Sequence, residues 1–204
     1  MPLEQPDPAI LKAAQRGDEQ AFAWIFEAYR RPFHSYVSRM LNDDLVAEDI
    51  TQEIFMRVHR SLARFDRRSL FTSWLFQIAK NRIVDEHRAR ARRPTGQLEP
   101  DGLSADPRSV EPNGDTREIV SAIWEAVAML DSRLKNALLL RDVAGLSYLE
   151  IAEVLEIDIG NVKWRIFKAR EAVQNELAVA GLSPSYRAPA LAPATRKTAA
   201  AATS

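Results

Sequence analysis

The sequence predicts an all-α protein made of two small helical domains joined by a flexible linker. Apolar residues recur at three- and four-residue spacing in both halves of the chain, and no stretch alternates as a strand would. Between the halves, residues 94–115 are rich in proline and have no apolar period, as is typical of a linker. We therefore expect domains at 10–93 and 116–180, and a disordered tail rich in alanine and proline at 181–204.

Three helices are expected in the first domain. The first spans about residues 18–41, and Pro32 inside it is a candidate position for a kink or a division. The second spans about residues 45–64. The third spans about residues 72–90, and Asn81 is a candidate position for a break.

The second of these helices has two different faces. Five apolar residues at four-residue spacing form its expected buried stripe: Val46, Ile50, Ile54, Val58 and Leu62. The opposite face carries Asp49, Gln52 and Glu53, which are therefore free to bind a partner. A simple solvated acidic face would show the same pattern.

The second domain is expected to end in a helix-turn-helix. Two helices precede it, at about 116–130 and 134–140. Ser147 and Glu150 then form a capping-box pattern that opens a short helix. The small side chain of Ala152 allows a second helix to cross closely, and residues 156–158 form the turn.

The last helix, at about 159–177, has the pattern of a DNA-recognition helix. It is expected to bury Val162, Ile166, Ala169 and Val173. The face left outside carries four positive charges, two aromatic rings and no acid: Asn161, Lys163, Trp164, Arg165, Phe167, Lys168 and Arg170. An α-helix fits the major groove of DNA, where lysine and arginine reach phosphates or guanine edges. The alternative is a solvated basic helix whose tryptophan belongs to a core.

Charge alternates along the chain although its total is zero. Residues 1–56 carry a net −5 and residues 57–93 a net +8, whereas residues 94–131 carry a net −6 and residues 132–204 a net +3. Two basic blocks between acidic ones indicate more than one kind of partner.

The composition excludes several kinds of site. Without cysteine the chain has no disulfide and no thiolate metal site, and its three histidines are not at a ligand spacing. We therefore expect no metal and no cofactor. No apolar run is long enough to span a membrane, and the first fifteen residues do not resemble a secretory signal. A cytoplasmic protein without membrane insertion is the expectation.

Three segments, taken in order, resemble the sigma-70 family of RNA polymerase sigma factors, in particular its extracytoplasmic-function (ECF) group. They are AEDITQEIFMRVHRSLARF, SLFTSWLFQIAKNRIVDEHRARARR, and DVAGLSYLEIAEVL followed by GNVKWRIFKARE. The first two resemble region 2 and the last resembles region 4. The likeness covers about residues 10–93 and 116–178.

The resemblance implies partners for the first domain. Asp49, Gln52 and Glu53 match positions that dock on the clamp helices of the largest subunit of core RNA polymerase. The segment that melts and reads the −10 promoter element is matched by Trp74, Lys80, Asn81, Arg82, Asp85 and Arg88. In the family Asn81 corresponds to a loop that cradles a flipped base, while Trp74 could equally be core packing.

For the second domain the resemblance implies contacts to the −35 promoter element and to the polymerase flap. The matching DNA contacts are Arg141, Lys163, Trp164, Arg165, Phe167 and Lys168. Trp164 stands where the family most often has a small residue, and Glu156 replaces a usual glycine in the turn. A side chain at 156 is tolerable if its backbone stays outside the left-handed region. An anti-sigma factor is a further partner that the resemblance implies.

These residues bear on three candidate functions. The first is a sigma factor that gives core polymerase its promoter specificity. The second is a stand-alone helix-turn-helix regulator, which the basic segment 71–93 disfavours because an effector domain needs no second nucleic-acid surface. The third, an enzyme, has no phosphate loop or nucleophile–base arrangement to support it, so we expect no catalytic residues. The acidic linker is either a passive spacer or a mimic of nucleic acid.

Overall fold

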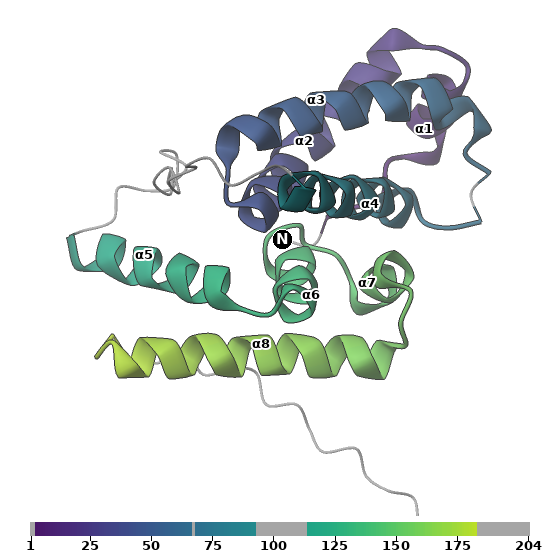
Figure 1. The fold of residues 1–204 in the computed structure, drawn as a ribbon. Helices are drawn as coiled ribbons and strands as arrows, with labels where there is room; N and C mark the ends of the chain where they lie inside the picture. The colour runs from purple at the N-terminus through teal and green to yellow at the C-terminus, as the bar shows by residue number, and fades with distance from the viewer. Residues whose placement is uncertain (1–2, 67, 93–113, 183–204) are drawn as a thin grey trace, which may run out of the picture.

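All regular structure in the described residues is helical (Figure 1). The computed structural model describes residues 3–66, 68–92 and 114–182. The elements are α1 (Pro8–Gln15), α2 (Glu19–Leu41), α3 (Asp44–Ser61), the 3₁₀ turn η1 (Leu62–Arg64), α4 (Phe71–Arg92), α5 (Gly114–Met129), α6 (Ser132–Asp142), α7 (Tyr148–Leu155) and α8 (Ile159–Val179). The linker and tail predictions lie almost entirely outside the described residues.

The first half of the chain packs α2, α3 and α4 around an aromatic core. Tyr29, Phe33 and Tyr36 of α2 are almost fully buried, as is Phe76 of α4. The Phe33 and Phe76 rings lie 5.5 Å apart between their centres, and Tyr36 meets Phe76 edge to face. Burial of these large rings holds α2 and α4 together.

Pro32 does not divide α2, and α4 runs unbroken through Asn81. Both helices are continuous because buried residues lie on each side of these positions: Tyr29 and Phe33 in α2, Ala79 and Ile83 in α4. Tertiary packing therefore outweighs the weaker local preference. The break considered at Asn81 is wrong, since this side chain simply faces solvent.

The helix α1 was not expected from the sequence. Its N-cap is Asp7, whose carboxylate accepts a hydrogen bond from the Ala9 amide, and Pro8 occupies the first turn. With only eight residues it buries just Leu11 and Ala14. Two apolar positions are too few for a recognisable period, but the Asp-Pro pair is a helix-start signal.

The second half forms the expected helix-turn-helix. In α7 the Ser147 side chain and the Glu150 carboxylate exchange hydrogen bonds with each other's backbone, which completes the capping box. Asp158 caps α8. Glu156, between the two helices, adopts φ 56° and ψ 45°. This is the left-handed region. A side chain at position 156 was expected to be tolerable only outside that region, so this expectation is not met.

The two halves pack against each other, which the sequence did not predict. α4 lies against α7 and α2 contacts α6, while in Figure 1 α8 forms the opposite side of the molecule. The hydroxyl of Tyr36 donates a hydrogen bond of 2.9 Å to the side-chain oxygen of Asn136 on α6. The buried apolar residues form one cluster that includes both halves.

Candidate DNA and polymerase interfaces

The outer face of α8 exposes aromatic rings beside a cation. Trp164 is 56% exposed and Phe167 is 47% exposed, and Lys163 also faces solvent. Val162, Ile166 and Ala169 are buried on the other side, as expected, while Val173 is only partly buried. Two exposed rings this close together on one helix face form an apolar patch of the kind that a partner can cover. Trp164 is therefore not a core residue.

The remaining cations of α8 are less free than the spacing suggested. Lys168 pairs with Glu171 at 2.6 Å, so this side of the helix does carry an acid. Arg170 leans towards α6 and pairs with Asp142 at 2.6 Å. Arg165 is half-buried. Lys163 is accordingly the most accessible cation of the expected DNA contacts on α8.

Arg141 has a structural partner. Its guanidinium donates a hydrogen bond of 2.7 Å to the Leu146 carbonyl and lies 4.8 Å from the centre of the Tyr148 ring. These contacts fix the loop between α6 and α7 and leave Arg141 half-buried at the edge of the helix-turn-helix. At least one N–H group of Arg141 is therefore already hydrogen-bonded within the protein.

On α4 the expected −10 residues fall into two groups. Asn81, Asp85 and Arg88 face solvent, and the last two form a loose ion pair at 3.8 Å. Trp74 is half-buried against Phe65, with 4.9 Å between the ring centres. Packing therefore accounts for much of the Trp74 surface, as the alternative explanation had it.

Lys80 and Arg82 already have acidic partners in this structure. The Lys80 ammonium lies 2.9 Å from a carboxylate oxygen of Glu156, at the end of α7. Arg82 donates to Glu53 on α3 at 2.8 Å and to Glu86 at 3.1 Å. The sequence could not predict either contact to another element, because each joins residues far apart in the chain.

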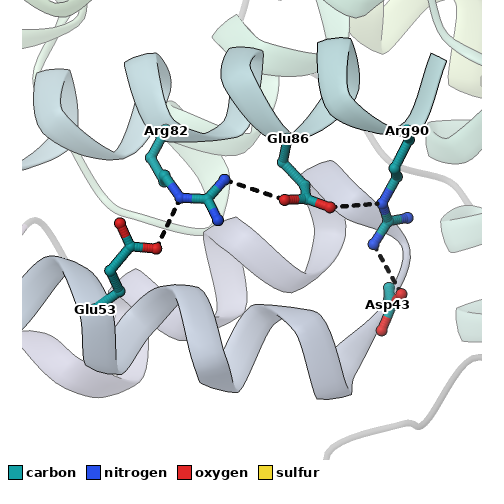
Figure 2. A network of polar contacts seen from close by, with 5 residues as sticks. All are labelled: Asp43, Glu53, Arg82, Glu86 and Arg90. Carbon is teal, nitrogen blue, oxygen red and sulfur yellow. Dashed lines mark hydrogen bonds and ion pairs between the residues drawn. The ribbon is translucent and has the colours of Figure 1, made fainter. Parts of the chain in front are cut away.

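A ladder of alternating charges joins α3 and α4 (Figure 2). In order along it stand Glu53, Arg82, Glu86, Arg90 and Asp43. Burial alone would raise the pKa of Glu86, but the hydrogen bonds from Arg82 and Arg90 outweigh it and lower the pKa below its ordinary value. The ladder therefore holds a buried carboxylate in its charged form.

The outer face of α3 is as the sequence predicted. Asp49, Gln52 and Glu53 are exposed, opposite the buried Ile50 and Ile54. Gln52 also borders a hollow of about 450 Å³ between α2 and α3, lined by Phe22, Phe26, Gln52, Phe55, Met56, His59 and Arg60. This face thus offers acidic groups next to an apolar depression.

A second, more apolar groove lies between α5, α6 and α8. Its volume is about 380 Å³, and Ile123, Trp124, Val127, Leu138, Leu139, Val143, Val173 and Leu177 supply most of its lining. Asp142 and Arg170 stand beside these residues. The groove has the character of a site for an apolar helix or loop of a partner.

Comparison with known proteins decides the family. The family models for Sigma-70 region 2 and for Sigma-70, region 4 match residues 25–93 and 121–173. The chain is 33% identical to the RNA polymerase sigma-H factor of Pseudomonas aeruginosa, over 87% of this chain and 96% of that protein. The chain belongs to the sigma-70 family.

Further relatives place this sigma factor in the ECF group. It is 32% identical to the ECF RNA polymerase sigma factor SigW of Bacillus subtilis, over 82% of this chain and 94% of that protein. It is also 32% identical to the ECF RNA polymerase sigma-E factor of Escherichia coli strain K12, over 84% and 94%. It is therefore an ECF sigma factor that directs promoter-specific transcription, and a stand-alone regulator is not favoured.

Solved structures share the fold of this sigma factor. CnrH in complex with the cytosolic domain of CnrY gives a TM-score of 0.66 at 21% identity, over 85% of this chain and 98% of that one. RpoE in complex with the anti-sigma factor NepR from Bartonella quintana gives 0.64 at 22% identity, over 78% and 98%. At these identities the likeness concerns the fold alone.

Sequence reasoning missed the acidic partners of the sigma factor's basic residues. The positions Arg82, Glu86 and Arg90 follow a four-residue spacing, which signals neighbours on one helix face. That spacing could have predicted the two contacts within α4, from Arg82 and Arg90 to Glu86. The closure of the ladder onto Asp43 and Glu53 depends on how α3 packs against α4, which no local pattern specifies.

Proposed function

We propose that this sigma factor divides promoter recognition between its two halves and polymerase binding between two surfaces. The supporting observation is that α4 and α8 each expose polar or basic residues, while α3 exposes an acidic face on the same half as α4. One chain thus offers two nucleic-acid surfaces and a distinct surface for a protein. A sigma factor needs this combination, whereas neither a regulator nor an enzyme does.

In the first half, α4 reads the −10 element. Asn81 and Arg88 are exposed for contact with an unstacked base and with phosphate, and Asp85 is placed to accept a hydrogen bond from a base. Lys80 and Arg82 add positive charge once their acidic partners release them. Trp74 supports this surface from its packed position beside Phe65.

In the second half, α8 enters the major groove at the −35 element. Lys163 contacts phosphate or guanine, and the rings of Trp164 and Phe167 pack on thymine methyl groups or sugars. Lys168, Arg165 and Arg141 act at the edge of this contact, because each is partly buried or already paired. Trp164 therefore contributes to the preferred −35 sequence.

Two surfaces serve core polymerase. Asp49, Gln52 and Glu53 dock on the clamp helices, and the groove between α5, α6 and α8 takes the polymerase flap. Because RNA polymerase is cytoplasmic, the protein acts there, and it performs no catalysis of its own. An anti-sigma factor is a further expected partner, since RpoE from Bartonella quintana is seen with one.

Run-off transcription tests this proposal. Core RNA polymerase is incubated with a pool of genomic promoter fragments, with and without the full chain, and the transcripts are mapped. We expect initiation at a defined set of promoters only when the chain is present. No promoter-specific transcript under any condition would overturn the proposed function.

The assignment of α8 has its own test. Lys163→Ala with Lys168→Ala removes two expected −35 contacts and should lower transcription about tenfold or more on promoters that need the −35 element. Lys12→Ala, at an exposed lysine of α1, is the matched control. Unchanged −35-dependent transcription in the double variant would show that α8 is not the reading helix.

A further inference from the structure

One tyrosine ring contacts two of the cations proposed to bind −35 DNA. Tyr148 is the first residue of α7. The guanidinium carbon of Arg141, on α6, lies 4.8 Å from the centre of its ring, and the ammonium nitrogen of Lys163, on α8, lies 5.8 Å from the same centre. Both distances are within the roughly 6 Å over which an aromatic face attracts a cation. A single side chain of α7 therefore contacts charges that come from two other helices.

The ring of Tyr148 is itself held in place. The capping box that Ser147 and Glu150 form around it fixes the backbone that carries the ring, through two hydrogen bonds. The ring is partly buried and packs against the apolar core. A tyrosine side chain has few torsions to order, so a ring in this position is a rigid support for the charges above it.

The two cations over this ring have no carboxylate to neutralise them. Lys168, further along α8, pairs with Glu171 at 2.6 Å. Within the described residues, neither Arg141 nor Lys163 forms an ion pair with an acid. An acidic partner must leave before a cation can pair with a phosphate, whereas an aromatic face attracts the cation and leaves its charge in place. Arg141 and Lys163 thus remain available to DNA phosphates.

The two cations differ in how firmly they are held. Arg141 also donates a hydrogen bond of 2.7 Å to the Leu146 carbonyl. For Lys163 the Tyr148 ring is the only charged, hydrogen-bonding or aromatic contact in the part of the chain that the structure describes. A free lysine side chain loses rotational freedom when it binds a phosphate, and this loss weakens binding. Contact with the ring restricts Lys163 beforehand, so less freedom is lost when DNA arrives.

We infer that Tyr148 is a positioning residue of the −35 surface, whose ring holds Arg141 and Lys163 in place for DNA phosphates before DNA binds. The inference rests on the proposed role of α8 at the −35 element. The acting group is the face of the ring, and the hydroxyl has no part in it. Because phosphate contacts set the register of a protein on the duplex, the ring sets where α8 lies in the groove.

The ring is tested with Tyr148→Phe and Tyr148→Leu in the full chain bound to core polymerase. Phenylalanine keeps the aromatic face without the hydroxyl, whereas leucine keeps an apolar side chain without the face. We expect Tyr148→Phe to bind a −35-dependent promoter as the wild type does. Tyr148→Leu should bind about fivefold more weakly, since each exposed contact between a cation and a ring changes an equilibrium about two- to fivefold.

The salt dependence of the same binding separates positioning from a loss of folded protein. Each phosphate contact adds about 0.9 to the slope of log affinity against log salt concentration. Tyr148→Leu should therefore show a shallower slope than the wild type, and Tyr148→Phe the wild-type slope. Unfolded protein would lower the affinity and leave the slope unchanged. If thermal unfolding shows that Tyr148→Leu is not folded, Tyr148→Met takes its place.

Coupling between the ring and Lys163 is measured in a double-mutant cycle. Once Lys163→Ala has removed one of the two cations, adding Tyr148→Leu should cost less affinity than it does in the wild type. Arg133→Ala is the matched control, at an exposed arginine of α6 that has no contact with the ring among the described residues. The losses from Arg133→Ala and Tyr148→Leu should simply multiply.

Three results would overturn the inference. A loss in Tyr148→Phe as large as that in Tyr148→Leu would assign the effect to the hydroxyl, as a direct contact with DNA. Wild-type affinity in Tyr148→Leu would show that the ring does not act, and multiplying losses with Lys163→Ala would show that it acts apart from Lys163. None of these touches the proposed function, which fails only if the wild-type chain with core polymerase initiates nowhere.

Discussion

Lys135 is a cation buried at the contact between the two halves. It lies on α6 with 9% of its surface exposed, and it has no hydrogen-bond or ion-pair partner among the residues that the structure describes. Burial lowers its pKa below 10.5, and the nearby charge of Arg39 lowers it further. Arg39 carries the same charge as Lys135 and therefore cannot neutralise it; its guanidinium lies over the Trp124 ring at 3.9 Å.

We predict that Lys135→Met stabilises the protein at neutral pH. The variant keeps an unbranched side chain but removes a charge on a largely buried residue that has no acidic partner among the described residues, so the free energy of unfolding should rise by about 1 kcal/mol. Urea unfolding at pH 7 measures it, with Arg133→Met on the exposed face of α6 as the control. A destabilised Lys135→Met protein would contradict the electrostatic explanation.

The pH dependence of this effect follows from the lowered pKa. Between the folded pKa and 10.5 the unfolded chain binds more protons at Lys135 than the folded protein does. The stability of the wild type should therefore rise with pH through this window. We expect the advantage of Lys135→Met to shrink as the pH approaches 10.5, measured by the same unfolding curves.

At the residue scale, the sequence predicted which side chains face solvent better than it predicted which side chains they pair with. Asp49, Gln52 and Trp164 face solvent as their helical positions required. Lys80 and Arg82 were correctly placed on α4, but their partners come from α7 and α3. Periodicity along one helix reports which face a residue occupies, and it carries no information on what another helix brings to that face.

At the scale of the elements, the charge ladder joins α3 to α4 through side chains that lie far apart in the sequence. Glu86 is buried and accepts hydrogen bonds from Arg82 and Arg90, which reach across to α3 through Glu53 and Asp43 (Figure 2). It thereby fixes the −10 helix relative to the helix proposed to bind polymerase. Together with the apolar core, this carboxylate helps to set the relative position of the two functional surfaces.

We predict that Glu86→Gln lowers the free energy of unfolding by about 1–3 kcal/mol, the usual range for hydrogen bonds to a charged group. Asp85→Asn, next to it but exposed and only loosely paired with Arg88, should change stability little. Chemical denaturation of both variants at pH 7 provides the comparison. Similar values for the two would show that the ladder does not hold α4.

Acid should reduce the difference between wild type and Glu86→Gln. Because the pKa of Glu86 is lowered in the folded protein, its contribution is present at neutral pH and is lost as the pH falls below 4.5 through the folded value. We expect the two unfolding free energies to converge in that range. A constant difference down to acid pH would indicate that the Glu86 charge is not the cause.

Helices with several buried positions could be predicted from the sequence, and those with few could not. Ile50, Ile54 and Val58 of the predicted α3 stripe are buried as expected, whereas Val46 is only partly buried. The capping box of α7 also appears where expected. The short α1 buries only two apolar residues and escaped notice. At Asn81, local composition favoured a break that packing around Ala79 and Ile83 prevents.

At the scale of the whole molecule, the packing of the two halves was not predictable. Each half has a complete amphipathic pattern of its own, so periodicity gives no sign of the contact between α4 and α7. The contact uses side chains with ordinary local roles, such as Glu150 of the capping box and Tyr36 of the aromatic core. Only the three-dimensional arrangement assigns them this second role.

The length of the linker limits how far the two halves can separate. The two promoter elements lie about 85 Å apart, so the tether must cover most of the distance between the halves when both are read, and deleting residues 99–108 shortens its reach by about 35 Å. We predict that this deletion lowers run-off transcription at least about tenfold on promoters that need both elements, because the shortened chain cannot hold both halves on DNA.

A Gly/Ser segment of equal length in place of residues 99–108 separates the two interpretations of the linker. This replacement preserves reach but removes Glu99, Asp101 and Asp106. A passive spacer predicts that transcription stays near the wild-type level, since only contour length matters. An acidic mimic of nucleic acid predicts that the replacement fails as the deletion does, because the carboxylates themselves would then contact the basic channel of polymerase.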